Sequence, residues 1–322
     1  MKFRSVPVTT IRKLAMKNNI KHRGKDIEDV IDELIENGHK DKLDYLQQQY
    51  TFAGTNLTLI KTEDDFPESC KTSDDFLNKI IKDGHIRKDQ INHQWEPKLR
   101  PGIHICAIQK RNNDVYLKLV VEKTAVRKKG YTTIEESYAS YTTVVIHFSD
   151  QVIELRCAFT DRKKFAEYLM KMMGFGESYD KWFSLTKTTK LEAVKISNLL
   201  SAGLVSTRIN IPSSVGALRI MAKKQIDLRV DRTYSKLKEV ISEHANLPVD
   251  DIFDEVCEFT ITDPVAEIEI PASFEIKLKK EGFKFNNSVP EIVYEQVIEA
   301  FIRVNYLDKE KALEEKKLNF KV

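Results

Sequence analysis

The sequence has few of the residues that mark cofactor sites and disulfide-stabilised folds. It contains 11 glycines among 322 residues, and neither G-x-G-x-x-G nor G-x-x-x-x-G-K-[ST] occurs, which argues against dinucleotide-binding and P-loop proteins. The four cysteines lie far apart without a C-x-x-C pair, so neither a zinc site nor a disulfide framework is expected. No window approaches the roughly 20 apolar residues of a membrane span. We therefore expect no cofactor, no metal ion and no membrane association, and a reducing, cytoplasmic location.

The sequence also lacks the patterns of common hydrolases. Neither a G-x-S-x-G nucleophile elbow nor an H-E-x-x-H metal site occurs, and the seven histidines show no ligand spacing. His104 and His147 fall on expected strands, where we expect partly buried histidines with hydrogen-bond partners. These absences favour a non-enzymatic function.

Charged residues are abundant, but their signs nearly cancel. Asp, Glu, Lys and Arg make up 31% of the chain, hydrophobic residues make up 41%, and the formal net charge is +3. This composition is typical of a globular protein, and the length allows two or three domains. Because the overall charge is small, binding to an anionic partner has to come from local clusters of cations.

The clearest cluster lies in residues 8–37. Apolar residues recur there with helical spacing in two short stretches, which predicts two amphipathic helices joined by a basic turn. Residues 1–25 carry eight Lys or Arg and no acid, whereas residues 26–36 carry six acids and no base. A helical hairpin with segregated signs presents a cationic face to an anionic partner.

The order T-I-R-K-L-A, Asn19-Ile20, Gly24-Lys25 and V-I-D-E-L-I resembles a SAP-type or Rho N-terminal-type helix-extended-helix module. The resemblance covers about a tenth of the chain. It implies that the first helix and the turn contact nucleic-acid phosphates, with double-stranded DNA favoured. The residues it assigns to these contacts are Arg12, Lys13, Lys17, Lys21, Arg23 and Lys25. The pattern leaves open a helical hairpin that docks on the rest of the chain or on a protein partner.

Beyond this segment the pattern predicts an α+β fold. Apolar residues alternate with period two in several stretches from Ile103 onward, and each group of strands is followed by a helix. The two groups allow two similar α+β subdomains. The expected limits are 1–61 for a helical domain, 62–75 for an acidic linker, 76–178 and 179–308 for the two subdomains, and 309–322 for a charged tail.

Two further basic clusters are candidate nucleic-acid contacts. Arg127, Lys128, Lys129 and Tyr131 fall in the connection between two expected strands, at 115–124 and 141–148, where a protruding hairpin would grip phosphates and offer the tyrosine for stacking. The alternative is an ordinary solvated loop. The second cluster consists of Lys223 and Lys224 with Arg219, Arg229 and Arg232 nearby.

One enzymatic pattern remains. Asp263, followed twelve residues later by Glu275 and Lys277 on strand-like sequence, resembles the PD-(D/E)xK nuclease core in spacing. Two carboxylates on neighbouring strands would hold a divalent cation there. Ordinary strand alternation also explains these residues, with Phe274 and Ile276 on the inner face.

Together these observations predict a non-enzymatic DNA-binding protein. Its basic helical module would contact phosphates, and its α+β body would bind DNA or a protein partner. The alternatives are a protein-interaction scaffold or adaptor and, as a minor one, a metal-dependent nuclease.

Overall fold

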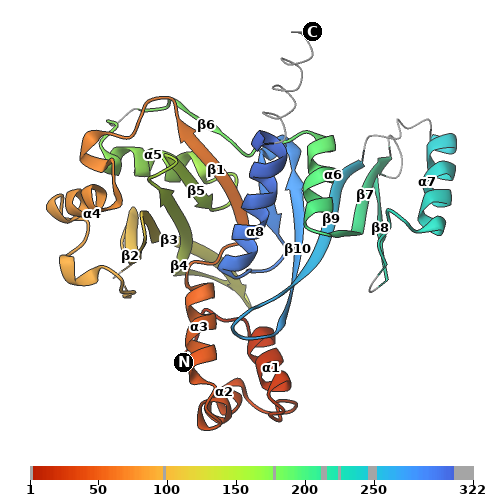
Figure 1. Ribbon diagram of the computed structural model, residues 1–322, viewed down its shortest axis with the longest axis horizontal. Coiled ribbons are helices and arrows are strands. Elements are labelled where there is room, and N and C mark those ends of the chain that lie inside the picture. Colours follow the sequence, from red (N-terminus) through yellow and green to blue (C-terminus); the bar gives the residue numbers. More distant parts are fainter. Residues whose placement is uncertain are drawn as a thin grey trace, which may run out of the picture. The chain divides into compact units, whose positions relative to one another are not determined.

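The protein has an α+β fold, as the sequence predicts, and the computed structural model divides it into two compact units (Figure 1). The structure describes residues 3–96, 99–176, 179–211, 216–223, 226–245 and 252–307. Unit 1 combines Met1–Ala53 with Lys187–Val322, and unit 2 is the intervening segment Gly54–Thr186.

Unit 1 begins with three helices around a small apolar core, which we call the helical module. They are α1 (Val8–Lys17), α2 (Ile27–Glu36) and α3 (Lys40–Thr51). The two predicted apolar stripes face each other, and Ile11, Leu14, Val30 and Leu34 are fully buried. Gly24, in the turn between α1 and α2, has a φ of +73°, a conformation that glycine adopts without the steric cost of a side chain.

The rest of unit 1 is an antiparallel sheet with helices packed on it. The strand order is β11–β10–β9–β7–β8. The elements are α6 (Lys190–Leu199), β7 (Gly203–Ile211), β8 (Gly216–Met221), α7 (Arg232–Ala245), β9 (Ile252–Thr262), β10 (Glu269–Lys277), the 3-10 turn η3 (Leu278–Lys280), β11 (Gly282–Phe285), α8 (Glu291–Ile302) and the π-helical turn η4 (Arg303–Leu307).

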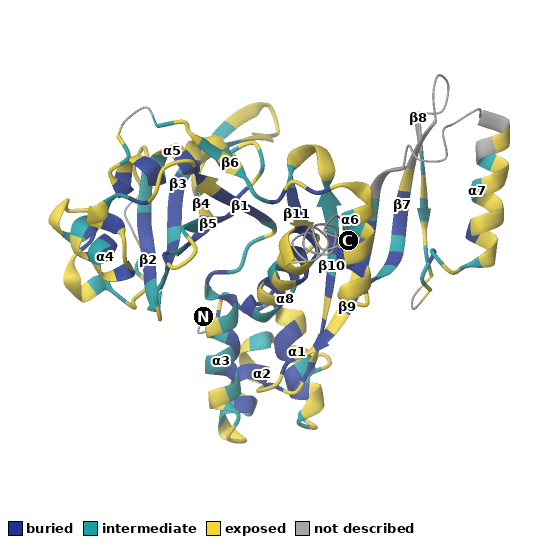
Figure 2. Ribbon diagram, turned by 45° about the horizontal axis from the view of Figure 1, so that its top comes forward, coloured by how far each residue is buried: buried dark blue, intermediate teal, exposed yellow. Residues whose placement is uncertain are grey.

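Alternation along these strands gives the sheet an apolar face and a polar face. On the apolar face, Phe285 of β11 stacks edge-on against Tyr294 of α8, with ring centroids 5.1 Å apart. Ser197 of α6 reaches the same face and donates a hydrogen bond to Sγ of Cys257 on β9, at 3.6 Å. The helices α6 and α8 therefore cover this face. In contrast, α7 is exposed along most of its length (Figure 2), although the side chain of Tyr234 is buried.

The helical module is anchored to the β9–β10 turn of the same unit. The Lys13 ammonium donates to the main-chain oxygen of Glu269 at 2.9 Å. Lys42 on α3 forms an ion pair with Glu267 at 3.0 Å, and this hydrogen bond and charge lower the pKa of Glu267. The domain limits expected from the sequence treat residues 1–61 as a separate domain. In the structure, the helical module belongs to the same unit as the C-terminal strands.

Unit 2 is a second antiparallel sheet with two helices on its apolar face. The strand order is β2–β3–β4–β5–β1, and β6 pairs with β1. A single core joins α4 and α5 to the sheet through residues such as Phe76, Leu117 and Leu169. The elements are β1 (Asn56–Thr62), the 3-10 turn η1 (Glu68–Cys70), α4 (Ser73–Lys82), the 3-10 turn η2 (Lys88–Gln90), β2 (Ile103–Arg111), β3 (Asp114–Lys129), β4 (Thr132–His147), β5 (Val152–Arg156), α5 (Arg162–Met173) and β6 (Trp182–Ser184).

The structure differs from the expected limits in unit 2 as well. The expected linker, residues 62–75, lies within unit 2, and its Phe66 and Cys70 are buried against the core. The two sheets also connect their strands differently: β1, the first strand of unit 2, lies between β5 and β6, whereas β7, the first strand of the unit 1 sheet, lies between β8 and β9. The expected charged tail at 309–322 lies outside the described residues.

Candidate nucleic-acid interface

The helical module exposes four of the six cations that the resemblance assigns to phosphate contacts. Arg12 and Lys17 lie on α1, and Lys21 and Arg23 lie in the turn before α2. All four side chains are exposed, and residues 1–25 contain no acid that would neutralise them within their own segment. We call Arg12, Lys17, Lys21 and Arg23 the module cations.

The other two cations of this set are already engaged. Lys13 is bound to the main chain at Glu269, and Lys25 forms an ion pair with Glu33 of α2. A lysine that holds the fold together is less available for a phosphate. The acidic α2 therefore neutralises Lys25, whereas the module cations remain exposed, so the separation of signs seen in the sequence is kept on this surface.

The cluster around Arg127 lies within two strands rather than in a loop. β3 and β4 pair continuously from Asp114 and His147 to Lys129 and Thr132, so the predicted connection is a two-residue turn. Lys128 is exposed, and Tyr131 in the turn is 110% exposed. Arg127 is paired with Glu136 at 3.7 Å, and the side chain of Lys129 lies outside the described residues.

A further group of cations gathers on the polar face of the unit 1 sheet, around a hollow of about 440 Å³. Register explains the gathering, because Arg208 pairs with Arg219, and Glu275 pairs with Lys284 on the next strand pair. An acid lies among these cations, because Lys277 is ion-paired with Glu275. The mixed signs make this hollow a weaker anion site than the module cations. The lining residues are Ser206, Arg208, Arg219, Val256, Glu275, Lys277 and Lys284.

Sequence reasoning did not find this hollow, although it named Arg219 as part of a basic cluster. The cations come from two hairpins, β7–β8 and β10–β11, that are far apart in the chain, and the register of the sheet brings them to the same face. The sequence feature that pointed to this face was the alternation along β10, which directs Glu275 and Lys277 outward. Another member of the predicted cluster, Lys224, lies outside the described residues.

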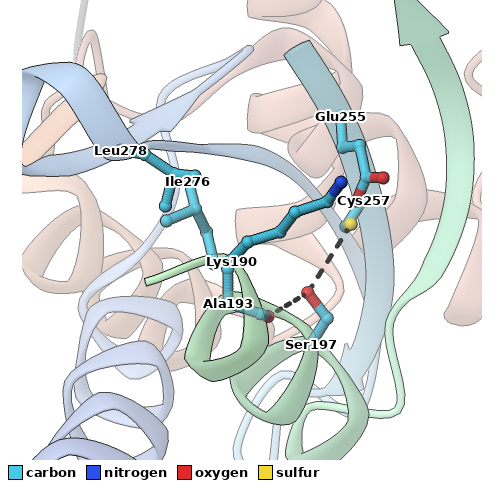
Figure 3. A pocket seen from close by; sticks show the side chains of 7 residues that line it. All are labelled: Lys190, Ala193, Ser197, Glu255, Cys257, Ile276 and Leu278. Carbon is cyan, nitrogen blue, oxygen red and sulfur yellow. Dashed lines mark hydrogen bonds between the residues drawn. The ribbon is translucent and has the colours of Figure 1, made fainter. Parts of the chain in front are cut away.

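On the apolar side of the same sheet, a small cavity of about 50 Å³ lies beneath α6 (Figure 3). Ser197 donates there to the Cys257 sulfur, and Arg229 donates to the same sulfur at 3.0 Å. Arg229, which the sequence placed in a basic cluster, is thus directed into the fold. Burial raises the pKa of the Cys257 thiol, and a cavity of this size has room for only a few water molecules.

The nuclease pattern is not assembled in the structure. Glu275 pairs with Val256 in the β9–β10 register, and Asp263 lies seven residues further along the chain, just past the end of β9, which is about 23 Å at strand spacing. Asp263 is fully buried and accepts hydrogen bonds from the main-chain nitrogens of Val265 and Ala266, at 3.0 and 2.7 Å. It therefore caps the β9–β10 turn. No cluster of metal-ligating side chains occurs in the described part of the chain.

Asp263 also lies near the helical module. Burial, together with the negative charge of Asp263, raises the pKa of Tyr45 on α3 to about 12.

Of the two histidines on expected strands, His147 is in a buried charge network of unit 2. Its Nδ1 lies 3.0 Å from Asp114, its Nε2 lies 3.5 Å from Glu154, and Glu154 accepts a 2.7 Å hydrogen bond from Nε of Arg156. His104, in contrast, lies at the opposite end of the β3 ladder and approaches the oxygen of Pro101 at 3.0 Å.

The network determines the charge states of its members. Burial would lower the pKa of His147, but hydrogen bonds to Asp114 and Glu154 outweigh it and raise this pKa to about 10. Burial would likewise raise the pKa of Glu154, but the charge of Arg156 and the hydrogen bond from His147 lower it to about 2. His147 and Glu154 are therefore both charged near neutrality, and acidic and basic side chains alternate along the network, as in a structural ion network.

Neither the models of known protein families nor the curated protein sequences match this chain. The likeness of residues 8–37 to SAP-type modules thus stays a prediction, although α1 and α2 are both present. No helix in the described ranges has the length and apolar character needed to cross a membrane.

Proposed function

We propose that this chain is a non-enzymatic DNA-binding protein whose helical module contacts the phosphates of double-stranded DNA. The observation that carries the proposal is the exposure of the module cations on one short segment that contains no acid. Lys and Arg bind nucleic acid chiefly by displacing counterions from the phosphates, and such binding tolerates different base sequences.

The anchoring of the module supports this role. Lys13 and Lys42 fix α1 and α3 to the β9–β10 turn, so the module cations project from a supported surface. Side chains on a supported helix lose less conformational entropy on binding than those on a loose tail.

Charge reversal tests the proposal directly. The variant Arg12→Glu, Lys21→Glu, Arg23→Glu should bind a labelled duplex much more weakly than the wild type in a mobility-shift titration. The module cations alone should contribute about 3 to 4 to the slope of log affinity against log salt concentration, about 0.9 per neutralised phosphate. The variant should therefore have a slope lower than that of the wild type by about 3.

A charge-matched control separates local contacts from overall charge. Lys88, Lys181 and Lys195 are also exposed, and their reversal to glutamate should leave DNA binding close to that of the wild type. Circular dichroism should show unchanged folding in both variants. Equal affinity of the two triple variants, or no binding by the wild type, would contradict the proposal.

A protein partner is the second candidate, and one observation favours it. On the exposed helix α7, Leu237 is 40% and Val240 is 51% exposed, and Val230 just before the helix is 80% exposed. If the partner is a second copy of this chain, sedimentation should show concentration-dependent association that Leu237→Asp with Val240→Asp abolishes. Monomers at all concentrations would exclude that self-association.

A further inference from the structure

The β3–β4 hairpin extends well beyond the sheet of unit 2. β2 pairs with β3 as far as Val121, and β5 pairs with β4 from Thr143 onward. Residues 122–140 thus form a two-stranded ribbon whose two edges carry no other strand in the described part of the chain. From residue 122 to the turn at Gly130 the ribbon is about 26 Å long. We call residues 122–140 the ribbon arm.

The end of the arm is a tight turn that displays one aromatic residue. Lys129 pairs with Thr132 across a two-residue turn, and Gly130 has a φ of +61° at the first turn position. Hairpin turns with glycine at this position keep the twist of the two strands. Tyr131 follows at the second position, fully exposed, with its ring outside the reach of the sheet core.

The two strands of the arm differ in charge. After Glu122, β3 carries Lys123, Arg127 and Lys128, whereas the facing part of β4 carries Glu135 and Glu136. Lys123 is paired with Asp161 at 3.3 Å, Arg127 is paired with Glu136 at 3.7 Å, and both cations are exposed. Cations therefore predominate on β3 near the turn while the acids lie on β4, and an anionic surface would attract the β3 edge of the arm more than the β4 edge.

We propose that the ribbon arm lies in the major groove of duplex DNA, with the β3 edge toward the phosphates and Tyr131 against the base edges. This inference rests on the proposed function. The major groove is about 12 Å wide and about 8.5 Å deep and admits a two-stranded ribbon. The arm is longer than the groove is deep, so its turn can reach the base edges while its base remains outside.

Two variants separate the tyrosine from the cations in a fluorescence-anisotropy titration of the full chain with a labelled duplex. Tyr131→Ala should weaken binding about tenfold, the range expected for an aromatic contact with a base, without changing the salt slope. Arg127→Gln with Lys128→Gln should lower the slope by up to about 2. As a matched control, Tyr138→Ala removes a tyrosine that is 46% exposed on the arm but far from the turn, and it should bind as the wild type does.

Modified duplexes test the groove. A duplex with bulky substituents at the 5-positions of its pyrimidines should weaken wild-type binding and abolish the difference between wild type and Tyr131→Ala. A dye bound in the minor groove should leave that difference intact. The opposite pattern would overturn the assignment to the major groove. If Tyr131→Ala loses as much affinity for single-stranded DNA as for the duplex, the ring stacks on unpaired bases. That result would also overturn the assignment to the major groove.

The failure of this inference is distinct from failure of the proposed function. Wild-type binding that Tyr131→Ala does not change would refute the arm alone, because the module cations still account for the affinity. Absence of wild-type binding to any duplex would refute both.

Discussion

The substitution Glu154→Gln gives the sharpest test of the buried charge network. Glu154 and Arg156 have 1% and 0% exposed side chains, and Glu154 also faces His147. Glutamine keeps the size of the side chain but removes the negative charge that both cations share. Because water cannot compensate at this depth, the loss should resemble the breaking of a buried ion pair, about 3 to 5 kcal/mol of unfolding free energy.

Tryptophan fluorescence makes this measurement specific to one unit. Both tryptophans of the chain, Trp95 and Trp182, lie in unit 2, and both pack against its core. With a urea dependence of about 2 kcal/mol per molar, a loss of 3 kcal/mol lowers the unfolding midpoint by about 1.5 M. The control Arg87→Gln, in an exposed pair with Asp89 of the same unit, should leave the midpoint unchanged.

A double variant at Glu154 and Arg156 tests whether the loss comes from the unpaired buried charge. Glu154→Gln with Arg156→Met removes the carboxylate and the guanidinium together and should cost less than Glu154→Gln alone, because the fully buried Arg156 cation is then no longer left facing a neutral amide. A single variant that loses less than about 1 kcal/mol, or a double variant that loses the sum of the two single losses, would show that the network is not stabilised by its alternating charges.

Three further predictions concern the same two units. The stability of unit 2 should depend on pH in a urea titration followed by tryptophan emission. His147, whose pKa is raised to about 10, should stabilise the unit fully below pH 6.5 and lose this effect as the pH rises toward 10. Glu154, whose pKa is lowered to about 2, should stabilise it fully above pH 4.5 and lose this effect as the pH falls toward 2. His147→Gln should remove the alkaline part; an unchanged alkaline profile would contradict the assignment. Gly24→Ala should lower the stability of unit 1 by about 1 kcal/mol in far-ultraviolet circular dichroism, because the added methyl meets no atom within 4 Å and the cost comes only from the positive φ. Asp263→Ala should cost about 1 to 3 kcal/mol, since it leaves two turn nitrogens without their acceptor, and DNA should not be cleaved with divalent cations by wild type or variant.

The sequence predicted best those elements whose pattern is purely local. The stripes of α1 and α2 follow directly from helical spacing, and both helices are present in the structure. Strand β1 was missed for a physical reason: Leu57, Thr58, Leu59 and Ile60 are all buried, so no period-two alternation shows. The outer parts of β3 and β4 were taken for a connection because both faces of the arm are exposed.

In the candidate site, too, the features set by neighbouring residues could be predicted, and those set by distant residues could not. The module cations are neighbours in the chain, so composition alone identified them. Whether a given lysine is available depended on partners more than 200 residues away, as with Lys13 and Glu269, and no local pattern carries that information. The hollow on the polar face required the register of four strands.

The division of unit 1 into two chain segments has a consequence for folding during synthesis. Lys42 leaves the ribosome long before Glu267, its partner, and at 5–20 residues per second the delay is roughly 10 to 45 s. Unit 2 is one continuous segment and is completed within this interval. The nascent chain therefore carries a folded globule between an N-terminal hairpin and the sheet that has yet to be made, and the last stage of folding is the closure of a long loop whose contents are already rigid.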